Sequence, residues 1–360
     1  MTAQTKTILK GYFNIGDKLS ETNFVDFIDS LSGRYYSRLV AASNAPADVI
    51  AQADYVCDGI DDDVQIQAAL DDLTGGIILL SIGTFTIAAE ATITIGTNEK
   101  LVGSGNATII TRVAAGDAPW IVMGNDTSIE RLHVTLVYQG TSSAAIRCWN
   151  VSNIILRDLF ISGGTNQASV YAISLHNTMV NHCDNILIET ACSGWEIIIS
   201  TPLHDYEWGN GIFNHCEVHN SVTGSIGWHI AGAGARTYNL MQFNACFAAC
   251  LPANAAGSIG WKIDNCQFLT LCGCHTEGAD TALSINGLVA GGRTTKAIVF
   301  VNIYVNGAIN IDSNSYSTVF LGGILDGVLT DNQVTAKKKT RYIGVFNSSY
   351  EQIPDNPDGE

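Results

Sequence analysis

The chain has 360 residues, of which 46% are hydrophobic, 14% are charged, 35 are Gly and only 6 are Pro. This composition argues against disorder and suits many short strands joined by tight glycine turns. The 34 acidic and 18 basic residues give a formal charge of -16, so the average surface repels nucleic-acid phosphates and anionic membrane faces. Binding to nucleic acid is therefore not expected.

The N-terminus carries no predicted targeting segment. Its first residues, MTAQTKTILKGYF, lack the apolar stretch of a signal peptide, and nowhere do about 20 apolar residues follow one another. We expect a soluble protein made in the cytoplasm, with no membrane insertion. The one basic run, Lys337 to Lys339 with Arg341, is either a solvated turn or a local phosphate contact.

A short amphipathic helix is predicted near the N-terminus, over residues 19–32. Ser20 is a plausible cap, and four apolar residues share one helical face: Phe24, Phe27, Ile28 and Leu31. Because a lone helix of this length cannot bury its apolar stripe, we expect it to pack on a partner chain, a neighbouring subunit or the end of the main domain. Residues 1–50 are interpreted as an attachment segment, with a linker over residues 33–50.

A second helix is expected directly before the first strands. Asp62 and Gln65 form a predicted capping box, and the apolar face of the helix consists of Ile66, Ala69, Leu70 and Leu73. Gly75 and Gly76 end the helix, and the apolar run IILLSI then leads through Gly83 into FTI. We expect this helix to cover the open end of a stack of strands, hiding its hydrogen-bonding edge.

Beyond residue 90 the chain repeats short apolar runs separated by Gly, Asn, Asp, Ser or Thr, such as ATITIG, NIILRDLFISGG and AIVFVNIYVNG. Parallel strands of a doubly wound sheet need crossover helices of about ten or more residues, and no helix-length pattern intervenes here. The sequence therefore predicts an all-β fold, a right-handed parallel β-helix over residues 51–335. A C-terminal strand and tail follow over residues 336–360.

An internal repeat gives the strongest support for coils. GWEI, GWHI and GWKI recur every 33 residues, which places Trp195, Trp228 and Trp261 above one another in an aromatic ladder. Glu196, His229 and Lys262 then form the adjacent column. Cys183 and Cys216 share the interval of 33, and later coils are expected to hold about 22–24 residues.

The ten cysteines are interpreted mainly as small core residues. Cys183, Cys216, Cys246 and Cys266 lie in strand-like runs, where a thiol packs as a small apolar group. The densest group, LCGCH, has Cys-x-Cys spacing without a second matching pair, so zinc is the weaker interpretation. No metal and no other cofactor is expected.

Two stretches carry a family resemblance. The segment DGIDDDVQIQAALDDLTGGIILLSIGTFTI resembles the start of pectate-lyase-like β-helix proteins, in which Asp-Gly, an acidic pair, Ile-Gln-Ala-Ala and Gly-Gly precede the first coils. That superfamily includes polysaccharide lyases, glycoside hydrolases, epimerases and the trimeric tailspikes of bacteriophages. The resemblance covers about 30 residues and implies the fold more firmly than an activity.

The second stretch, TKTILKGYFNIGDKLSETNFVDFIDSL, is similar to the N-terminal segment of tail-fibre-type proteins of phages and prophages. This resemblance implies a virion appendage, a tailspike or tail fibre, that forms a homotrimer and binds polysaccharide on the host cell surface. Its other expected partners are tail or baseplate proteins of the virion.

The loop STPLHDYEWGNG is the best candidate for carbohydrate contact, together with the loop at 231–240. It combines sugar-stacking aromatic side chains with acids, and solenoids usually bind ligands through such loops: His204, Asp205, Tyr206, Glu207 and Trp208. Asp205 and Glu207 are tentative catalytic residues, while His204, Tyr206 and Trp208 are assigned to sugar binding. Alternatively, the aromatic residues pack on a neighbouring subunit and the acids face water.

Asp184 and Glu217 form a weaker catalytic candidate pair. Taken as equivalent positions one coil apart, they would lie about 4.8 Å apart, which suits a shared proton or a cation. Stacked acids on an exposed turn are the alternative. His182 and His215 form a similar column, interpreted as half-buried ladder residues or as general bases.

Three functions remain open from the sequence. The first is a glycan-binding appendage, the second a tailspike glycosidase with paired carboxylates, and the third a purely structural virion module. Uronate lyase activity is not favoured, because Arg236 and Lys262 are the only Arg or Lys residues between 158 and 292. Whether the protein is an enzyme stays open.

Overall fold

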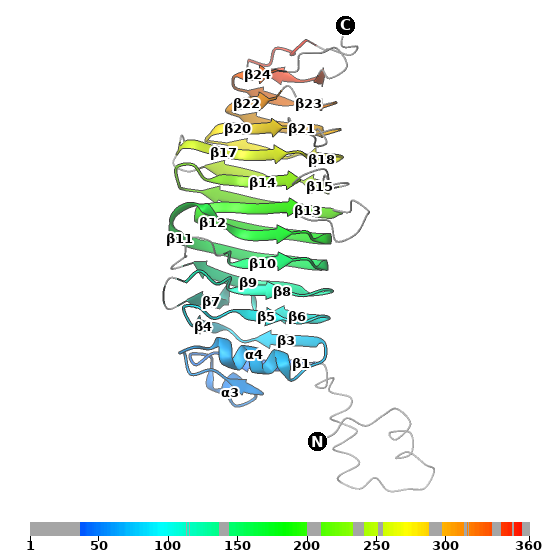
Figure 1. Cartoon of the computed structure of the whole chain (residues 1–360). Coiled ribbons are helices and arrows are strands. Elements are labelled where there is room, and N and C mark those ends of the chain that lie inside the picture. Colours follow the sequence, from blue (N-terminus) through cyan, green and yellow to red (C-terminus); the bar gives the residue numbers. More distant parts are fainter. Residues whose placement is uncertain are drawn as a thin grey trace, which may run out of the picture.

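The structure is a computed structural model that describes residues 37–354. Within this range it leaves out 113, 115, 137–143, 200–209, 233–240, 251–254, 288–296, 313–314, 316, 333–339 and 348. The chain winds into a tall stack of coils, with α4 at the N-terminal end and β24 near the C-terminal end (Figure 1). The predicted right-handed parallel β-helix is confirmed.

Each full coil contributes strands to three parallel faces, which we name A, B and C. Face A contains β1 (Ser37–Ala41), β3 (Gly76–Leu80), β6 (Glu99–Val102), β15 (Met241–Asn244), β18 (Leu269–Cys272) and β25 (Arg341–Ile343). Face B contains β4 (Gly83–Ile87), β7 (Thr108–Arg112), β16 (Phe247–Cys250), β19 (His275–Glu277) and β26 (Phe346–Asn347). Face C contains β5 (Ile93–Ile95), β8 (Ile121–Met123), β10 (Ile146–Trp149), β14 (Ile226–Gly232), β17 (Ala255–Asp264), β20 (Ala279–Asn286), β22 (Ala308–Ile311) and β24 (Leu329–Asp331).

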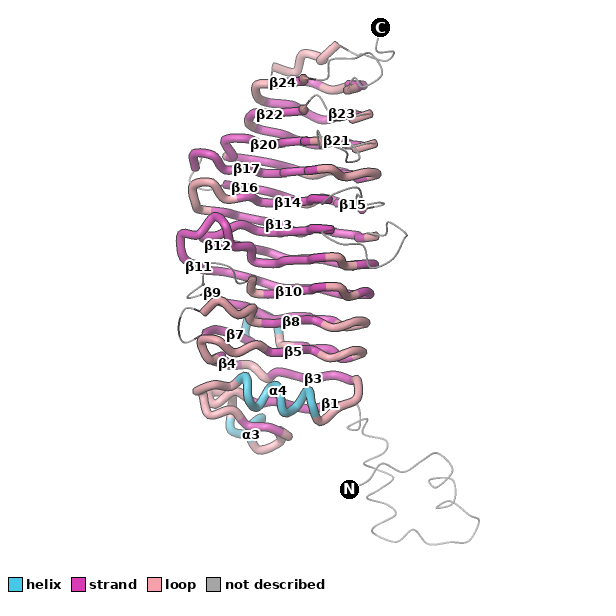
Figure 2. Tube along the Cα trace, in the orientation of Figure 1, coloured by secondary structure: helices cyan, strands magenta, loops and turns pink. Residues whose placement is uncertain are grey.

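Several long strands turn a corner and serve more than one face (Figure 2). They are β9 (Ser128–Leu136), β11 (Ser152–His176), β12 (Met179–Ile199), β13 (Gly211–Asn220), β21 (Val299–Asn306) and β23 (Val319–Asp326). The remaining elements are α3 (Ala47–Ile50), β2 (Tyr55–Val56), α4 (Asp63–Asp71) and the 3-10 turn Gly105–Ala107. All pairings between these described strands are parallel, and an isolated bridge from Phe346 to Gln352 is antiparallel.

The corner between faces A and B has a left-handed backbone residue in coil after coil. Asp158, Asn185, His215, Ala245 and Asn302 all have positive φ values there. Such a residue redirects the strand without breaking the ladder, and Asn and Asp tolerate this conformation better than most residues. The Asn185 amide also donates to the Asp158 carboxylate at 2.6 Å, which links two coils.

The interior is filled by side chains that stack from coil to coil. Trp195, Trp228 and Trp261 lie in register, with ring centroids 5.0 and 4.9 Å apart. The predicted tryptophan ladder is therefore confirmed. Phe213 and Phe243 stack in the same way at 4.7 Å on face A and meet the tryptophans edge to face.

Cys183 and Cys216 share the interval of the tryptophan repeat but do not lie in one column. Cys183 pairs with Phe213, and Cys216 pairs with Ile186. The reason is that the turn from face B to face C is longer in the coil of Phe213: more chain separates Phe213 from Trp228 than Cys183 from Trp195. The thiols are nevertheless buried core groups, as expected of Cys183, Cys216, Cys246 and Cys266.

Later coils are shorter than the repeat of the tryptophans, as expected. Ile263 pairs with Ile285, Phe300 with Phe320 and Phe320 with Tyr342, each a smaller step along the chain than from Trp228 to Trp261.

The start of the chain departs from the expectation in one respect. Strand pairing begins with β1 inside the stretch expected to be a linker, because Ser37 to Val40 pair with β3. The reason is that the apolar run of β1 buries Val40 and Ala41 in the first coil. The helix expected at 19–32 lies outside the described residues.

The helix predicted before the first strands is present as α4 and covers the N-terminal end of the stack (Figure 1). Ile66, Ala69 and Leu70 are buried against the first coil. The capping box, however, is wrong, because the Asp62 side chain makes no cap hydrogen bond. Its fully buried carboxylate instead accepts the backbone N–H groups of Gly59 at 2.8 Å and Thr86 at 2.7 Å, which ties the helix to β4.

Candidate functional site

The five residues of the favoured loop lie outside the described residues: His204, Asp205, Tyr206, Glu207 and Trp208. The described chain ends before this loop on face C, in β12, and resumes at Asn210 before β13 of face A. Residues 233–240 of the second candidate loop are likewise outside, between β14 and β15. Both loops therefore connect the ends of face C strands to the start of face A.

The alignment expected for Asp184 and Glu217 is wrong. Asp184 pairs with Asn214 on face A, and Glu217 pairs with Leu187 on face B, beyond the corner. Instead, Asp184 Oδ1 lies 3.8 Å from His215 Nδ1, and Glu217 Oε2 lies 3.5 Å from His219 Nε2. The two acids do not form a one-coil pair.

His182 and His215 do not form the predicted column either. His182 pairs with Ile212, because the coil measured on face A, from Cys183 to Phe213, is shorter than the coil measured between the tryptophans. His215 occupies the left-handed corner position and its side chain is 71% exposed.

The predicted column of Glu196, His229 and Lys262 is confirmed on the outer side of face C. Glu196 pairs with His229 and His229 with Lys262, and the column extends to Ser174 below and Ser284 above. Neighbouring outward positions add His176 and Asp264. Two neighbouring groups joined by hydrogen bonds and an ion pair together form what we name the face C network: Tyr171, Ser174, His176, Glu196, His229, Lys262, Asp264 and Asn286.

The lower part of the network centres on Glu196. Its Oε2 atom lies 2.7 Å from His176 Nε2 and accepts the Ser174 hydroxyl at 3.0 Å. Burial by itself raises the pKa of this carboxyl, but the hydrogen bonds and charge of His176, with Ser174, outweigh burial and leave the pKa lowered. Glu196 is thus an ionised carboxylate at neutral pH.

The upper part centres on His229, whose two ring nitrogens are both engaged. The Tyr171 hydroxyl lies 3.1 Å from Nδ1, and Asp264 Oδ2 lies 3.0 Å from Nε2. Burial raises the pKa of Tyr171, so its hydroxyl stays protonated beside Nδ1. Because an ionised carboxylate only accepts hydrogen bonds, Nε2 donates its hydrogen to Asp264.

Asp264 is held by three partners at once. Besides His229, the Asn286 amide donates at 2.8 Å and Lys262 Nζ lies 3.4 Å away. Burial alone would raise the pKa of Asp264, but His229, Asn286 and Lys262 together lower it. Both carboxylates of the network are therefore ionised, and neither is poised as a general acid.

An exposed tryptophan borders the network. Trp149 ends β10 and is 49% exposed, and its ring meets the His176 ring edge to face at 5.8 Å between centroids. The Arg147 guanidinium lies 5.3 Å from the centre of the Trp149 ring. The flat Trp149 ring offers a surface for stacking. The polar side chains of face C recur at one-coil steps of about 4.8 Å and offer hydrogen bonds along the same face.

Sequence reasoning missed several of these residues: Trp149, Tyr171, Ser174, His176, Asp264 and Asn286. One signal was available for Trp149. In the run AIRCWN, Ile146 and Cys148 alternate with Arg147 and Trp149, which predicts an outward tryptophan once the strand is assumed. Nothing local connects Asp264 with Tyr171, because their proximity depends on coil stacking.

A shared metal between the cysteines of LCGCH is not supported by their placement. Cys272 is exposed whereas Cys274 is buried, so the two thiols lie on different sides of the chain. In the described ranges no three His, Cys, Asp or Glu side chains group into a metal site. No described helix is long and apolar enough to span a membrane.

No protein-family model and no curated protein matches this chain. Among solved structures, it is similar to ORF18 of Geobacillus virus E2, with 14% identity and a TM-score of 0.49, over 93% of this chain. The chain spans 66% of the length of that viral protein.

Two further similar structures are the A-modules of the Azotobacter vinelandii mannuronan C-5 epimerases AlgE6 and AlgE4. Their identities are 12% and 13% and their TM-scores 0.30 and 0.31; both alignments cover 81% of this chain, with 96% and 92% of the modules. With each TM-score below 0.5, the fold assignment rests on the strand pairings of this chain, and no activity follows from the likeness.

Proposed function

We propose that this protein binds polysaccharide along face C, as a phage-type appendage of a virion. The observation that carries the proposal is the half-exposed Trp149 in contact with the prearranged face C network. Aromatic rings stack on the apolar faces of sugars, while fixed carboxylates, imidazoles and amides bind hydroxyl groups. The network offers both within a few coils.

The position of the two candidate loops supports the same face. They connect to the ends of β12 and β14, the strands that carry Glu196 and His229. A sugar chain along face C would therefore run beside the attachment points of residues 200–209 and 233–240. Sugar binding by His204, Tyr206 and Trp208 is part of this proposal.

The virion assignment rests on the N-terminal segment similar to tail-fibre-type proteins. In this setting we propose a homotrimer attached to tail or baseplate proteins, with a polysaccharide of the host cell surface as ligand. An elongated stack of coils suits this role, because a repeated face contacts several sugar units at once.

Binding is favoured over hydrolysis by the charges of the network. Hydrolysis by paired carboxylates needs one carboxyl that stays protonated as general acid, and Glu196 and Asp264 both have lowered pKa values. Both ring nitrogens of His229 are also occupied. Cleavage by Asp205 and Glu207 remains the alternative, and a purely structural module is the third.

Trp149→Ala tests the proposal. We expect the intact protein to bind at least one bacterial surface polysaccharide in a panel of capsular and lipopolysaccharide O-chains. Loss of the ring should weaken that binding about tenfold, which corresponds to about 1.4 kcal/mol of stacking and apolar contact. Isothermal titration calorimetry measures the change, and release of reducing ends from the same samples reports any cleavage.

The matched control is Tyr350→Ala, which removes an aromatic side chain that is 78% exposed near the C-terminal end of the stack. It should leave the affinity unchanged. Equal weakening by both variants, or no binding to any polysaccharide in the panel, would contradict the proposal.

A further inference from the structure

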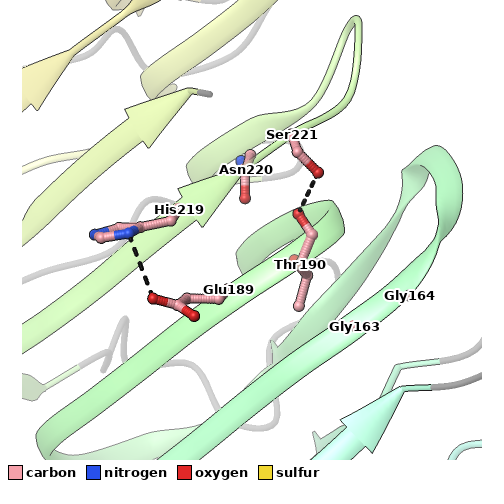
Figure 3. A pocket seen from close by; sticks show the side chains of 7 residues that line it. All are labelled: Gly163, Gly164, Glu189, Thr190, His219, Asn220 and Ser221. Atoms are coloured by element: carbon pink, nitrogen blue, oxygen red, sulfur yellow. Dashed lines mark hydrogen bonds and ion pairs between the residues drawn. The ribbon is translucent and has the colours of Figure 1, made fainter. Parts of the chain in front are cut away.

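A pocket of about 430 Å³ lies at the corner where face B ends, apart from the face C network. We name it the corner pocket, and Figure 3 shows its lining: Gly163, Gly164, Glu189, Thr190, His219, Asn220 and Ser221. Three consecutive coils build it, because Gly163 pairs with Thr190 and Thr190 with Asn220. The pocket thus has a defined place in the stack.

Glycine keeps one wall of the pocket open. Gly163 has a φ of +85°, and a Cβ atom there would lie 2.6 Å from the backbone oxygen of Leu136. Both the backbone conformation and the close approach exclude a side chain at this position. Gly164 follows with a φ of +103°, so two successive residues without side chains leave space beside Thr190.

Asn220 lines the pocket with a buried amide. Its side chain is 0% exposed, yet neither its amide nitrogen nor its amide oxygen has a hydrogen-bond partner. By contrast the neighbouring Thr190 hydroxyl donates to the backbone oxygen of Cys192 at 3.3 Å. A buried amide without partners lowers stability relative to an aliphatic side chain of similar size, so its partner is expected to come from outside the fold.

The rim supplies groups that bind hydroxyls. Glu189 is 48% exposed and its Oε1 atom lies 3.8 Å from His219 Nδ1. Figure 3 shows Asn220 between His219 and Ser221, with its amide oxygen on the side of Glu189 and Thr190. The exposed Ser221 hydroxyl donates to the Thr190 backbone oxygen at 3.4 Å, at the same rim.

We propose that the corner pocket binds a 2-acetamido sugar, with its acetamido group on Asn220. The Asn220 amide nitrogen donates to the acetamide oxygen, and the Asn220 oxygen accepts the acetamide N–H, so both unpaired atoms gain a partner. The Glu189 carboxylate then accepts from ring hydroxyls, and the Ser221 hydroxyl accepts from or donates to them. That the ligand bearing the acetamido group is a sugar rests on the proposed function. The corner pocket itself is separate from face C.

The test compares N-acetylglucosamine with glucose, using the full chain and saturation-transfer NMR titrations. N-acetylglucosamine should bind at least tenfold more tightly, because glucose leaves the Asn220 amide unpaired. Equal binding of the two sugars, or no binding of either, would mean that the buried amide holds water only, and would overturn the proposal.

Asn220→Leu should abolish the preference for N-acetylglucosamine while leaving the melting temperature equal or higher, because it removes an unpaired buried amide. The matched control is Asn181→Leu at another buried asparagine, whose amide nitrogen donates to the Thr178 hydroxyl at 2.9 Å outside the pocket. Because it loses that hydrogen bond, it should lower the melting temperature and keep the preference. A preference that survives Asn220→Leu overturns the proposal.

Glu189→Ala provides a second variant at a half-exposed position, which keeps the test valid if Asn220→Leu does not fold. It should weaken N-acetylglucosamine binding at least threefold, and unchanged binding counts against the proposal. Trp149→Ala separates this site from face C: the preference for N-acetylglucosamine over glucose should persist in this variant. If no polysaccharide binds to face C but the monosaccharide preference is found, the proposed function fails and the pocket stands.

Discussion

Three buried or half-buried carboxyl groups show how partners decide the direction of a pKa shift. Burial raises the pKa of Asp62, and the backbone hydrogen bonds from Thr86 and Gly59 offset this only in part. At Glu196 and Asp264, burial also raises the pKa, but histidine and other side-chain partners reverse its effect. Side chains gathered from different coils therefore determine the charge of the face C network.

The lowered pKa values predict a dependence of stability on acid. A carboxyl whose pKa is lower in the folded than in the unfolded state stabilises the fold above its unfolded value, near 4.5 for Glu and 3.8 for Asp. This stabilisation is lost as the pH falls through the folded value. The double variant Glu196→Gln, Asp264→Asn should be less stable at pH 7 and should lose less stability than the native chain between pH 5 and about pH 3.

Melting temperatures across this range, followed by circular dichroism, test the expectation. Asp48→Asn, at an exposed position in α3, serves as the control and should follow the native curve. A double variant whose curve runs parallel to the native one from pH 5 downward would refute a role of these two carboxyls in acid stability.

At the scale of elements, the interior depends on stacks of aromatic rings. Trp228 is fully buried between Trp195 and Trp261, and its indole N–H donates to the backbone oxygen of Phe247 at 3.2 Å. Each ring therefore packs on the coil below and the coil above. In a solenoid, where every coil contacts only its neighbours, such stacks connect the coils energetically.

Trp228→Ala should lower the free energy of unfolding by about 3–5 kcal/mol, because it leaves a cavity and removes two stacking contacts. Trp228→Phe should cost about 1–3 kcal/mol, since a ring remains but its shape differs. Urea unfolding followed by circular dichroism measures both. Trp149→Ala, at a half-exposed position, is the control and should change stability by less than about 1 kcal/mol.

The carboxylate of Asp62, at the start of α4, holds this helix to neighbouring backbone rather than capping it. Asp62→Ala removes the acceptor for the backbone N–H groups of Gly59 and Thr86 and should cost about 2–4 kcal/mol. The exposed neighbour Asp61 has a positive φ, so Asp61→Asn, which tolerates that conformation, should be nearly neutral. Urea unfolding compares the two; a neutral Asp62→Ala would show that Asp62 does not hold the helix on β4.

At the scale of the whole molecule, coil length varies while the strands stay in register. On face C, the step along the chain from Ile197 to Ile230 is longer than the step from Leu175 to Ile197, yet both pairs are aligned. Insertions therefore enter as turns and loops at the corners, where they do not disturb the ladder. This leaves a continuous face C that loops of different length can border.

The proposed appendage predicts a trimer in solution. Static light scattering of the purified chain should give three times 38.4 kDa, which is about 115 kDa. An assembled trimer would present three copies of face C and multiply a weak contact to one polysaccharide. A stable monomer would contradict the trimeric appendage and would favour a stand-alone carbohydrate-binding or carbohydrate-active protein.

Features that depend on local periodicity could be predicted from the sequence alone. Short apolar runs between turn residues predicted the strands, the apolar face of Ile66, Ala69 and Leu70 predicted α4, and the repeated GW pairs predicted the tryptophan ladder. Each of these signals follows from the geometry of a single helix, strand or repeat, so no knowledge of distant contacts was needed.

The contacts between side chains of different coils, by contrast, depend on how the coils are stacked. Asp184 and Glu217 share the interval of the tryptophan repeat but lie on different faces, whereas Tyr171 and Asp264, with no common spacing, both contact His229. The number of residues between aligned positions depends on the turns that separate them, so one sequence interval marks aligned residues on face C but not on faces A and B. The network and the corner pocket therefore follow from how the coils are stacked, which the local pattern of the sequence does not encode.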